Sequence, residues 1–472
     1  METTTPNAGK AASPSNLFYR ALKIFGDIRP GEGLTVLLLA LNIFLIMTNY
    51  YIVKSIRDAW IVSFSKKGPY IKSLLGAAIA IVLIFVVKAF SRLASKVPRQ
   101  ILITEVTLFF IVSLAVFYVL NLLNVPLLAV FFFIWAGIAS LLLPAQLWGF
   151  ANDIYTEDVG KRVFPFIAFG AAFGSVWGST ITGWLIPFLG RFNMMLVGAG
   201  NLGISIGLIW IVHKREIRRL ERKPSGTGPP GETAKHITEQ PLKTGGGFQL
   251  VFKSRYLLYI AVLIIFLNWV NTNGQWMLDN VFKGAAAEAI KAGTTGGVDE
   301  GNYLTMLYAN FFRNVNWVVL LIQLFLVSRI FKRLGVRGAI FIFPFLSLGG
   351  YALASFGATL LVVQWIKTLE NGTDYSLMNT IRGALYLITT REEKYKAKAA
   401  IDTVFVRVGD VLSAATVFLG SSYLAFKMES YAHLNVVCAA IWVLMAFLIV
   451  REHRKLSAAQ AAFRDPRSGI SF

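Results

Sequence analysis

Apolar residues along this chain come in blocks of about 20, and short polar segments separate the blocks. A helix rises about 1.5 Å per residue, so a block of that length crosses about 30 Å of hydrocarbon. The pattern therefore predicts membrane-spanning helices joined by short connections. We expect twelve spans, at residues 33–63, 70–90, 101–121, 126–150, 163–189, 191–212, 256–279, 303–328, 339–357, 359–384, 401–425 and 431–450.

A long polar segment divides the spans into two groups of six. Residues 224–247 are rich in Gly, Pro and charge, which is typical of a flexible linker. An all-α membrane protein with two six-helix halves and a long central loop has the major facilitator architecture. The expected divisions are an N-terminal segment (1–32), a first half (33–212), a linker (213–255), a second half (256–450) and a C-terminal tail (451–472).

Basic residues predict the orientation of the spans. They cluster in the loops after spans two, six, eight and ten, and the opposite loops hold far fewer. The positive-inside rule then places both termini in the cytoplasm, and we expect a cell inner membrane. One outer loop departs from the rule, because it carries Lys66, Lys67 and Lys72. The net charge of +21 therefore predicts topology, and we expect no nucleic-acid partner.

Composition and motifs exclude several kinds of chemistry. The chain has 472 residues, of which 56% are hydrophobic and only 15% charged, against about 25% charged in soluble proteins. There is one cysteine, the four histidines are scattered, and no GxxxxGK[ST] phosphate loop occurs. We therefore expect no catalytic residues, no metal site and no cofactor, and a monomer that is not an enzyme.

The first span is the strongest candidate for a binding site. After a long apolar run it continues through Asn49, Lys54, Arg57 and Asp58 before becoming apolar again. A charge near the bilayer centre costs about 2.5–3.5 kcal/mol on insertion scales, so such residues usually face a polar pathway or a partner. We predict that Lys54 and Arg57, three residues apart on one helix face, line a substrate cavity. Alternatively, Lys54 pairs locally with Asp58, four residues on.

Polar residues in the other predicted cavity helices extend this candidate site. Span seven reads NWVNTNGQW, in which Asn271 and Asn273 could contact a planar base or simply hold helices together, and Gly274 suggests a kink. In span ten, Asp374 could carry a proton, or be the counter-ion of Lys54 or Arg57, the role that we favour because unpaired buried carboxylates are unfavourable. The further candidates are Arg313 and Arg382 for the substrate, and Lys367, Glu370, Arg407 and Asp410 as coupling groups or counter-ions, the last two spaced to pair locally.

Three glycines in span five have a structural interpretation. Gly170, Gly174 and Gly178 form a GxxxGxxxG pattern. Small residues at this spacing let two helix backbones approach closely, so we expect a packing role.

Three stretches of sequence are similar to a known family. They are NYYIVKSIRDAWIV (49–62), LWGFANDIYTEDVGKRVFPFIAFGAAFG (147–174) and YSLMNTIRGALYLITTREEKYKAKAAIDTVFVRVGD (375–410). Together they resemble the ATP:ADP antiporter (nucleotide transporter) family, in its divergent bacterial branch. The resemblance implies a secondary transporter that exchanges nucleotides, with Lys54 as the lysine used in transport. Glutamates that the family carries in spans four and seven are missing, since residues 131–148 hold no acid and span seven has none before Asp279.

Three functional hypotheses follow. The first is exchange of anionic, phosphorylated solutes such as nucleotides by alternating access. The second is a proton-coupled carrier of another organic solute, driven through Asp374, Glu370 or Asp410. The third is a non-transporting scaffold or lipid-handling protein, which local pairing of every cavity charge would favour. The sequence leaves the substrate, the direction and the coupling ion open.

Overall fold

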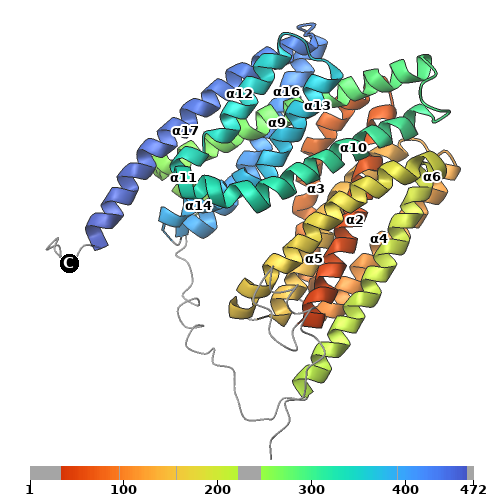
Figure 1. Ribbon diagram of the computed structural model, residues 1–472, viewed down its shortest axis with the longest axis horizontal. Helices are drawn as coiled ribbons and strands as arrows, with labels where there is room; N and C mark the ends of the chain where they lie inside the picture. The colour runs from red at the N-terminus through yellow and green to blue at the C-terminus, as the bar shows by residue number, and fades with distance from the viewer. Residues whose placement is uncertain (1–32, 95, 156, 222–245, 391, 465–472) are drawn as a thin grey trace, which may run out of the picture.

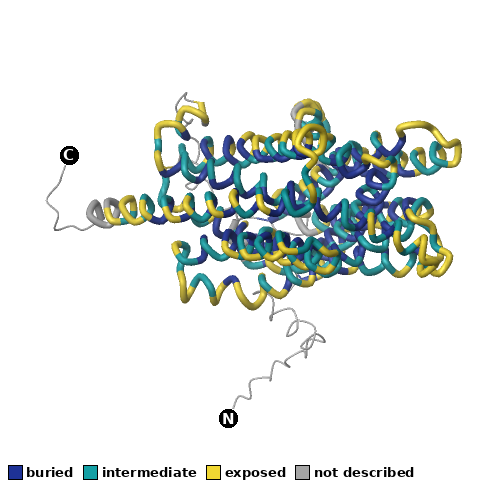
Figure 2. Tube along the Cα trace, turned by 90° about the horizontal axis from the view of Figure 1, so that it is seen from above, coloured by how far each residue is buried: buried dark blue, intermediate teal, exposed yellow. Residues whose placement is uncertain are grey.

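The computed structural model describes residues 33–464 except 95, 156, 222–245 and 391, and its regular elements are all helices. The predicted N-terminal segment, most of the linker and the end of the tail lie outside these residues. Within the described part, nine helices are long and apolar enough to cross a membrane. Two groups of helices make up the bundle (Figure 1), with buried residues between helices and exposed residues on the outer faces and at the loops (Figure 2).

The first half is formed by α2 (Gly33–Ser63), α3 (Gly68–Ala94), α4 (Arg99–Leu122), α5 (Leu128–Ile154) and α6 (Glu157–Glu221). The last of these is two helices in one, because Gly190 has non-helical angles of φ 74° and ψ 162°. A positive φ is readily adopted only by glycine. Gly190 therefore ends the predicted span five and starts span six, close to the predicted boundary.

The second half begins with α8 (Gly247–Lys253) and α9 (Arg255–Lys291), and ends with α17 (Met428–Arg464). Between them, several spans are interrupted by π-helical turns, at η1 (Ile322–Leu326), η2 (Asp374–Met378), η4 (Glu393–Ala397) and η5 (Ile401–Phe405). The remaining elements are α10 (Glu300–Leu321), α11 (Val327–Ala339), α12 (Ile342–Ala354), α13 (Leu360–Thr373), α14 (Asn379–Leu385), η3 (Tyr386–Ile388), α15 (Lys398–Ala400) and α16 (Val406–Ser422).

The glycine pattern has the packing role expected of it. Gly170, Gly174 and Gly178 lie directly against the backbone of α2. A Cβ atom at each would come within 2.3–2.4 Å of a carbonyl oxygen of α2, namely those of Ala40, Phe44 and Thr48. Because real Cβ atoms do not approach that closely, any larger residue would push the two helices apart. The three glycines thus allow α6 to pack closely against α2, the helix that carries Lys54.

The two halves meet near the connection between α2 and α3, at the end of the bundle away from the C-terminal end of α6, which we call the linker end (Figure 1). There the Lys72 ammonium of α3 lies 2.8 Å from the Asp279 carboxylate of α9. Lys283 donates to the carbonyl oxygens of Val62 and Ser65 in the other half. Toward the linker end the helices of the two halves diverge (Figure 1). The structure is therefore closed at one end, and the halves are apart at the other.

Candidate functional site

Lys54 lies between the halves and is surrounded by aromatic rings. Its Nζ atom is 4.3 Å from the centre of the Phe312 ring, and 5.4, 5.5 and 5.9 Å from those of Tyr51, Tyr50 and Tyr375. We call these four rings the Lys54 cage. Phe312 lies on α10 and Tyr375 on η2, so each half supplies two of the rings. Tyr375 is 45% exposed, so the cage is open on that side.

No carboxylate neutralises Lys54 in the part of the chain that the structure describes. Its charge is compensated by the faces of aromatic rings, which attract a desolvated cation by about 2 kcal/mol or more. The predicted alternative, a local pair with Asp58, does not form. Lys54 thus keeps a positive charge that an anion can bind.

Arg57 and Asp58 belong to a chain of ion pairs that runs from α2 to the second half. The Arg57 guanidinium lies 2.7 Å from the Asp58 carboxylate, which is also 3.7 Å from Lys72. Lys72 continues the chain to Asp279. We call these four residues the closing network, because its last link joins the halves where they are closed.

The acidic end of the closing network is almost completely enclosed. The Asp279 side chain is 2% exposed and that of Lys72 8%. The same carboxylate oxygen accepts hydrogen bonds from the Tyr308 hydroxyl at 2.6 Å and from the Gln275 amide at 2.9 Å. A buried carboxylate with one cation and two neutral donors is well satisfied, so the closed end is held by strong polar contacts.

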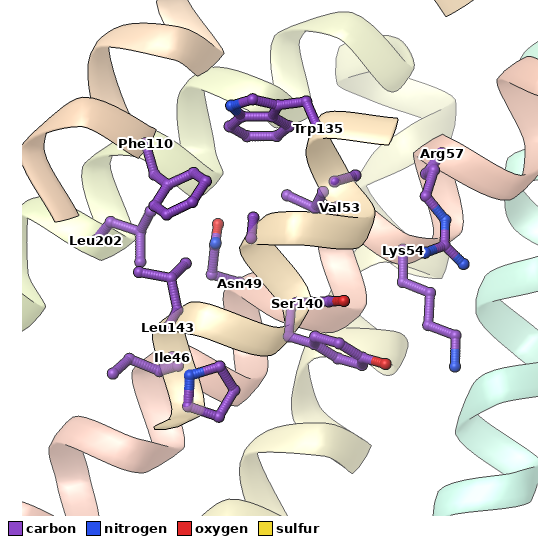
Figure 3. Close-up of a pocket in the computed structure, with 14 residues that line it drawn as sticks. Ile46, Asn49, Val53, Lys54, Arg57, Phe110, Trp135, Ser140, Leu143 and Leu202 are labelled. Atoms are coloured by element: carbon purple, nitrogen blue, oxygen red, sulfur yellow. The ribbon is translucent and has the colours of Figure 1, made fainter. Parts of the chain in front are cut away.

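A small pocket in the first half lies beside Lys54 and Arg57 (Figure 3). Asn49 lies in its middle and Trp135 at its upper edge in this view, while the two cations lie on the side that faces the second half. Asn49 is 3% exposed, and its Oδ1 atom and the Trp135 indole nitrogen are buried without a hydrogen-bond partner. The pocket has a volume of about 20 Å³, which accommodates about one water molecule.

A larger cavity lies between the halves, beside the closing network. Its volume is about 190 Å³. We call it the interface cavity, and its walls come from α3, α5, α9 and α16. The lining residues are Lys72, Ser73, Gly76, Phe133, Thr272, Gln275, Trp276, Asp279, Arg407 and Asp410.

The two candidate asparagines of span seven face different surroundings. Asn271 accepts hydrogen bonds from Lys367 through its backbone oxygen at 3.0 Å and its side-chain oxygen at 2.6 Å. Asn273 is fully buried and donates to Asn435 of α17 at 2.8 Å. A helix turns about 100° per residue, so Asn273 points away from the interface cavity and toward α17, and its role as a substrate contact stays a prediction. The face toward the cavity carries Thr272, Gln275 and Trp276 instead.

Gly274 does not interrupt the helix, since α9 is continuous through it. The glycine is needed for close approach, because a Cβ there would lie 1.7 Å from the Tyr351 hydroxyl oxygen. The kink expected at this position is therefore replaced by a tight contact between α9 and α12.

Lys367 and Glu370 neutralise each other inside the second half. Their side chains are 0% and 1% exposed, and the ammonium lies 2.5 Å from the carboxylate. Glu370 also accepts hydrogen bonds from Tyr351 at 2.9 Å and Ser347 at 3.2 Å. Together with the bonds to Asn271, this pair ties α9, α12 and α13 into one unit.

Asp374, which the sequence predicts to be the counter-ion of the first span, lies at the start of η2. Among the described residues no ion pair joins it to Lys54 or Arg57, because Arg57 has a nearer acid in Asp58. Asp374 directly precedes Tyr375 of the Lys54 cage. Arg382, about two turns further on, is bound to Asp402 at 2.5 Å.

The remaining predicted residues lie in different parts of the second half. Arg407 and Asp410 form the expected local pair at 2.9 Å, and Thr272 donates to the same carboxylate group at 2.8 Å. Arg313 is half-buried beside Phe312, and the described part of the chain offers it no ion pair. Thus Arg407 and Asp410 line the interface cavity, whereas Arg382 bridges spans ten and eleven.

Sequence reasoning missed Lys72 as a functional residue. The sequence groups it with Lys66 and Lys67 as an exception to the positive-inside rule, yet those two are exposed and Lys72 is buried. The signal in the sequence is a lysine two residues inside a predicted span. The aromatic partners of Lys54 gave no signal, because Phe312 and Tyr375 are far from it in sequence.

Comparisons with known proteins agree on a transporter. The family model described as "TLC ATP/ADP transporter" matches residues 118–457. An ADP,ATP carrier protein 1 of Chlamydia pneumoniae is 23% identical, covering 95% of this chain and 96% of its own. ADP,ATP carrier protein 4 of Rickettsia bellii is 25% identical over 68% of this chain and 65% of its own.

Solved structures with the same fold are transporters of the major facilitator type. The nucleoside transporter NupG has a TM-score of 0.60 at 10% identity, over 88% of this chain and 98% of that one. A bacterial homologue of the lysosomal transporter Spinster, in an inward-facing and unoccupied conformation, has a TM-score of 0.55 at 14% identity, over 91% and 99%. The all-helical, multi-pass fold predicted from the sequence is confirmed in this coarser form.

Proposed function

The chain belongs to the TLC ATP/ADP transporter family, and on that premise we propose that it exchanges nucleotides, or closely related phosphorylated anions, across a membrane by alternating access. The match to the family covers well over half of the chain. The relatives named ADP,ATP carrier proteins support the nucleotide as substrate.

Lys54 is the observation that carries this proposal. It is a cation between the two halves, held by aromatic rings and not by an acid of the described chain. A phosphate that enters from the open side of the cage finds an ammonium whose charge is still available. Arg57 lines the same pocket as Lys54 and would help to hold phosphate oxygens while it remains bound to Asp58. Arg313, which follows Phe312 of the Lys54 cage in the sequence, is proposed as a further phosphate contact.

The proposed topology counts α6 as two spans on either side of Gly190, which makes twelve spans in two halves (33–212 and 256–450). We propose that the protein is a monomer in the cell inner membrane. Both termini and the linker would then lie in the cytoplasm. The closed end then faces outward, and the conformation is inward-facing. If the two halves rock about the site, the end that is closed here would open and the linker end would close.

Exchange in proteoliposomes tests this function. Vesicles loaded with ADP should take up labelled ATP, and Lys54→Gln should reduce this uptake to the level of empty vesicles. Lys67→Gln removes a lysine from the exposed loop and should leave uptake unchanged, which controls for overall charge. Full activity of the Lys54→Gln protein, or no nucleotide exchange by the wild type, would refute the proposal.

A proton-coupled carrier remains the second candidate, and Asp374 is the observation that favours it. This carboxylate lies next to the Lys54 cage and has no ion-pair partner in the described chain. In that case a pH gradient alone would drive uptake into vesicles without internal substrate. Local pairing of every cavity charge would favour the scaffold hypothesis, and Lys54 pairs with no acid of the described chain.

A further inference from the structure

We infer that the interface cavity is the subsite for the nucleobase, while the phosphates bind at Lys54. This inference rests on the proposed function, since it divides a nucleotide between two places in the same site. The base would lie between α3 and α5 of the first half and α9 of the second. Base preference would then be determined by residues of α3 and α9, and not by the asparagines predicted from the sequence.

The walls of the cavity suit a planar ring. Phe133 contributes an aromatic ring from the first half, and Trp276 contributes an indole from the second. Bases stack on aromatic side chains with little dependence on which base it is. A ring bound here would touch both halves at once.

Polar atoms without partners supply the means to recognise a base edge. The Trp276 indole nitrogen and the Ser73 hydroxyl oxygen are buried and make no hydrogen bond. The Gln275 amide nitrogen donates to Asp279, and the Gln275 oxygen has no partner within the described residues. The residues that line the cavity therefore include an unpartnered donor, an acceptor and a hydroxyl that can be either. The edges of the bases carry donors and acceptors in patterns that differ from base to base.

The charges of the cavity favour a neutral group over a phosphate. Lys72 is bound to Asp279, and Arg407 to Asp410, so the two cations are balanced by two acids. A phosphate would have to compete with carboxylates that already hold these cations. The uncharged face of a base meets no such obstacle.

Arg57 connects the interface cavity with the Lys54 cage. Its guanidinium carbon is 4.9 Å from the centre of the Phe133 ring, which lines the cavity. It lies one turn beyond Lys54 on the same face of α2. A nucleotide with its phosphates at Lys54 would therefore pass Arg57 on the way to the cavity.

The pocket around Asn49 is the rival location for the base. It also has a buried indole nitrogen without a partner, that of Trp135. Its volume is about 20 Å³, against about 190 Å³ for the interface cavity, so it has room for about one water molecule and not for a ring. The two tryptophans thus form a matched pair for an experiment.

The experiment measures how well unlabelled ATP, GTP, CTP and tripolyphosphate inhibit exchange of labelled ATP in proteoliposomes. Trp276→Phe keeps an aromatic ring and removes the N–H group. It should change the ratio of the ATP and GTP inhibition constants by about fivefold or more, since a lost hydrogen bond in a polar site alters discrimination strongly. The constant for tripolyphosphate, which has no base, should stay the same. Trp135→Phe should change neither.

The outcomes separate this inference from the proposed function. An unchanged ATP-to-GTP ratio in both Trp276→Phe and Ser73→Ala overturns the base subsite while nucleotide exchange stands. A changed ratio in Trp135→Phe alone moves the base to the Asn49 pocket and also overturns it. If the wild type exchanges no nucleotide, the proposed function fails, and this inference with it. Ser73→Ala serves as the second variant should Trp276→Phe not fold.

Discussion

The ion pair between Lys72 and Asp279 should hold the closed end, so Lys72→Met should shift the protein toward the state that is open there. The variant leaves Asp279 buried without its cation. Removing one partner of a buried pair costs about 3–5 kcal/mol. The donors Tyr308 and Gln275 remain and offset part of this loss. We therefore take the lower value, about 3 kcal/mol, for the destabilisation of the closed end.

That energy corresponds to a change of about 150-fold in the equilibrium between the two states. If about 99% of the wild type is closed at this end, about 40% of the variant would be. The opposite end should close as this one opens. A distance across the linker end should then become shorter in a large fraction of the molecules.

Spin labels on Lys96→Cys and Arg333→Cys measure this distance, because both residues are exposed and lie at the linker ends of different halves. The only native cysteine, Cys438, is 3% exposed and should label poorly. Lys67→Met is the control, since Lys67 is exposed in the adjoining loop. The double variant Lys72→Met/Asp279→Leu leaves no stranded charge and should return toward the wild-type distribution. A distribution that Lys72→Met leaves unchanged would refute the reasoning.

Two further variants test the packing around the site. Gly174→Ala should lower the melting temperature and the transport rate, because its Cβ would lie 2.3 Å from the Phe44 oxygen. Gly203→Ala is the control and should lower neither, because a Cβ there has nothing within 4 Å. Equal melting temperatures of the two variants would contradict the close contact. Lys367→Met should destabilise the protein by about 3–5 kcal/mol, because it leaves the Glu370 carboxylate buried without a cation. Lys367→Met/Glu370→Met should destabilise it by much less, and denaturation in detergent measures both free energies. A double variant that is less stable than the single one would contradict this expectation and show that the pair contributes net stability.

The sequence predicts well those features that depend on local pattern. Apolar blocks of bilayer length predict membrane-spanning helices, and nine helices of the described residues are long and apolar enough to cross a membrane. The spacing of Gly170, Gly174 and Gly178 predicts a close helix contact, which the structure shows against α2. Lys54 is recognisable as a candidate because a charged residue within an apolar helix is unfavourable unless it faces a polar pathway or a partner. Arg407 and Asp410 pair as their spacing of three suggests.

Features that depend on the rotation and pairing of helices were not predictable in the same way. Asn271 and Asn273 look equivalent in sequence, but only the first faces Lys367. Lys72 and Asp279 are 207 positions apart, and nothing local indicates that they meet. Asp58 forms its ion pair with Arg57 and not with Lys54. This pairing depends on the direction of the side chains, which their spacing in the sequence does not determine.

The shared origin of the Lys54 cage has a consequence for the transport cycle. Tyr50 and Tyr51 move with Lys54 on α2, whereas Phe312 and Tyr375 belong to the other half. Rotation of one half against the other would strip the ammonium of two of its four rings. Without substrate, the carrier would have to change conformation while the Lys54 ammonium has lost two of its aromatic contacts. With substrate bound, the negative charge of the substrate would remain beside the ammonium throughout the change. Obligatory one-for-one counter-transport would follow from this difference in the barrier, without any separate coupling ion.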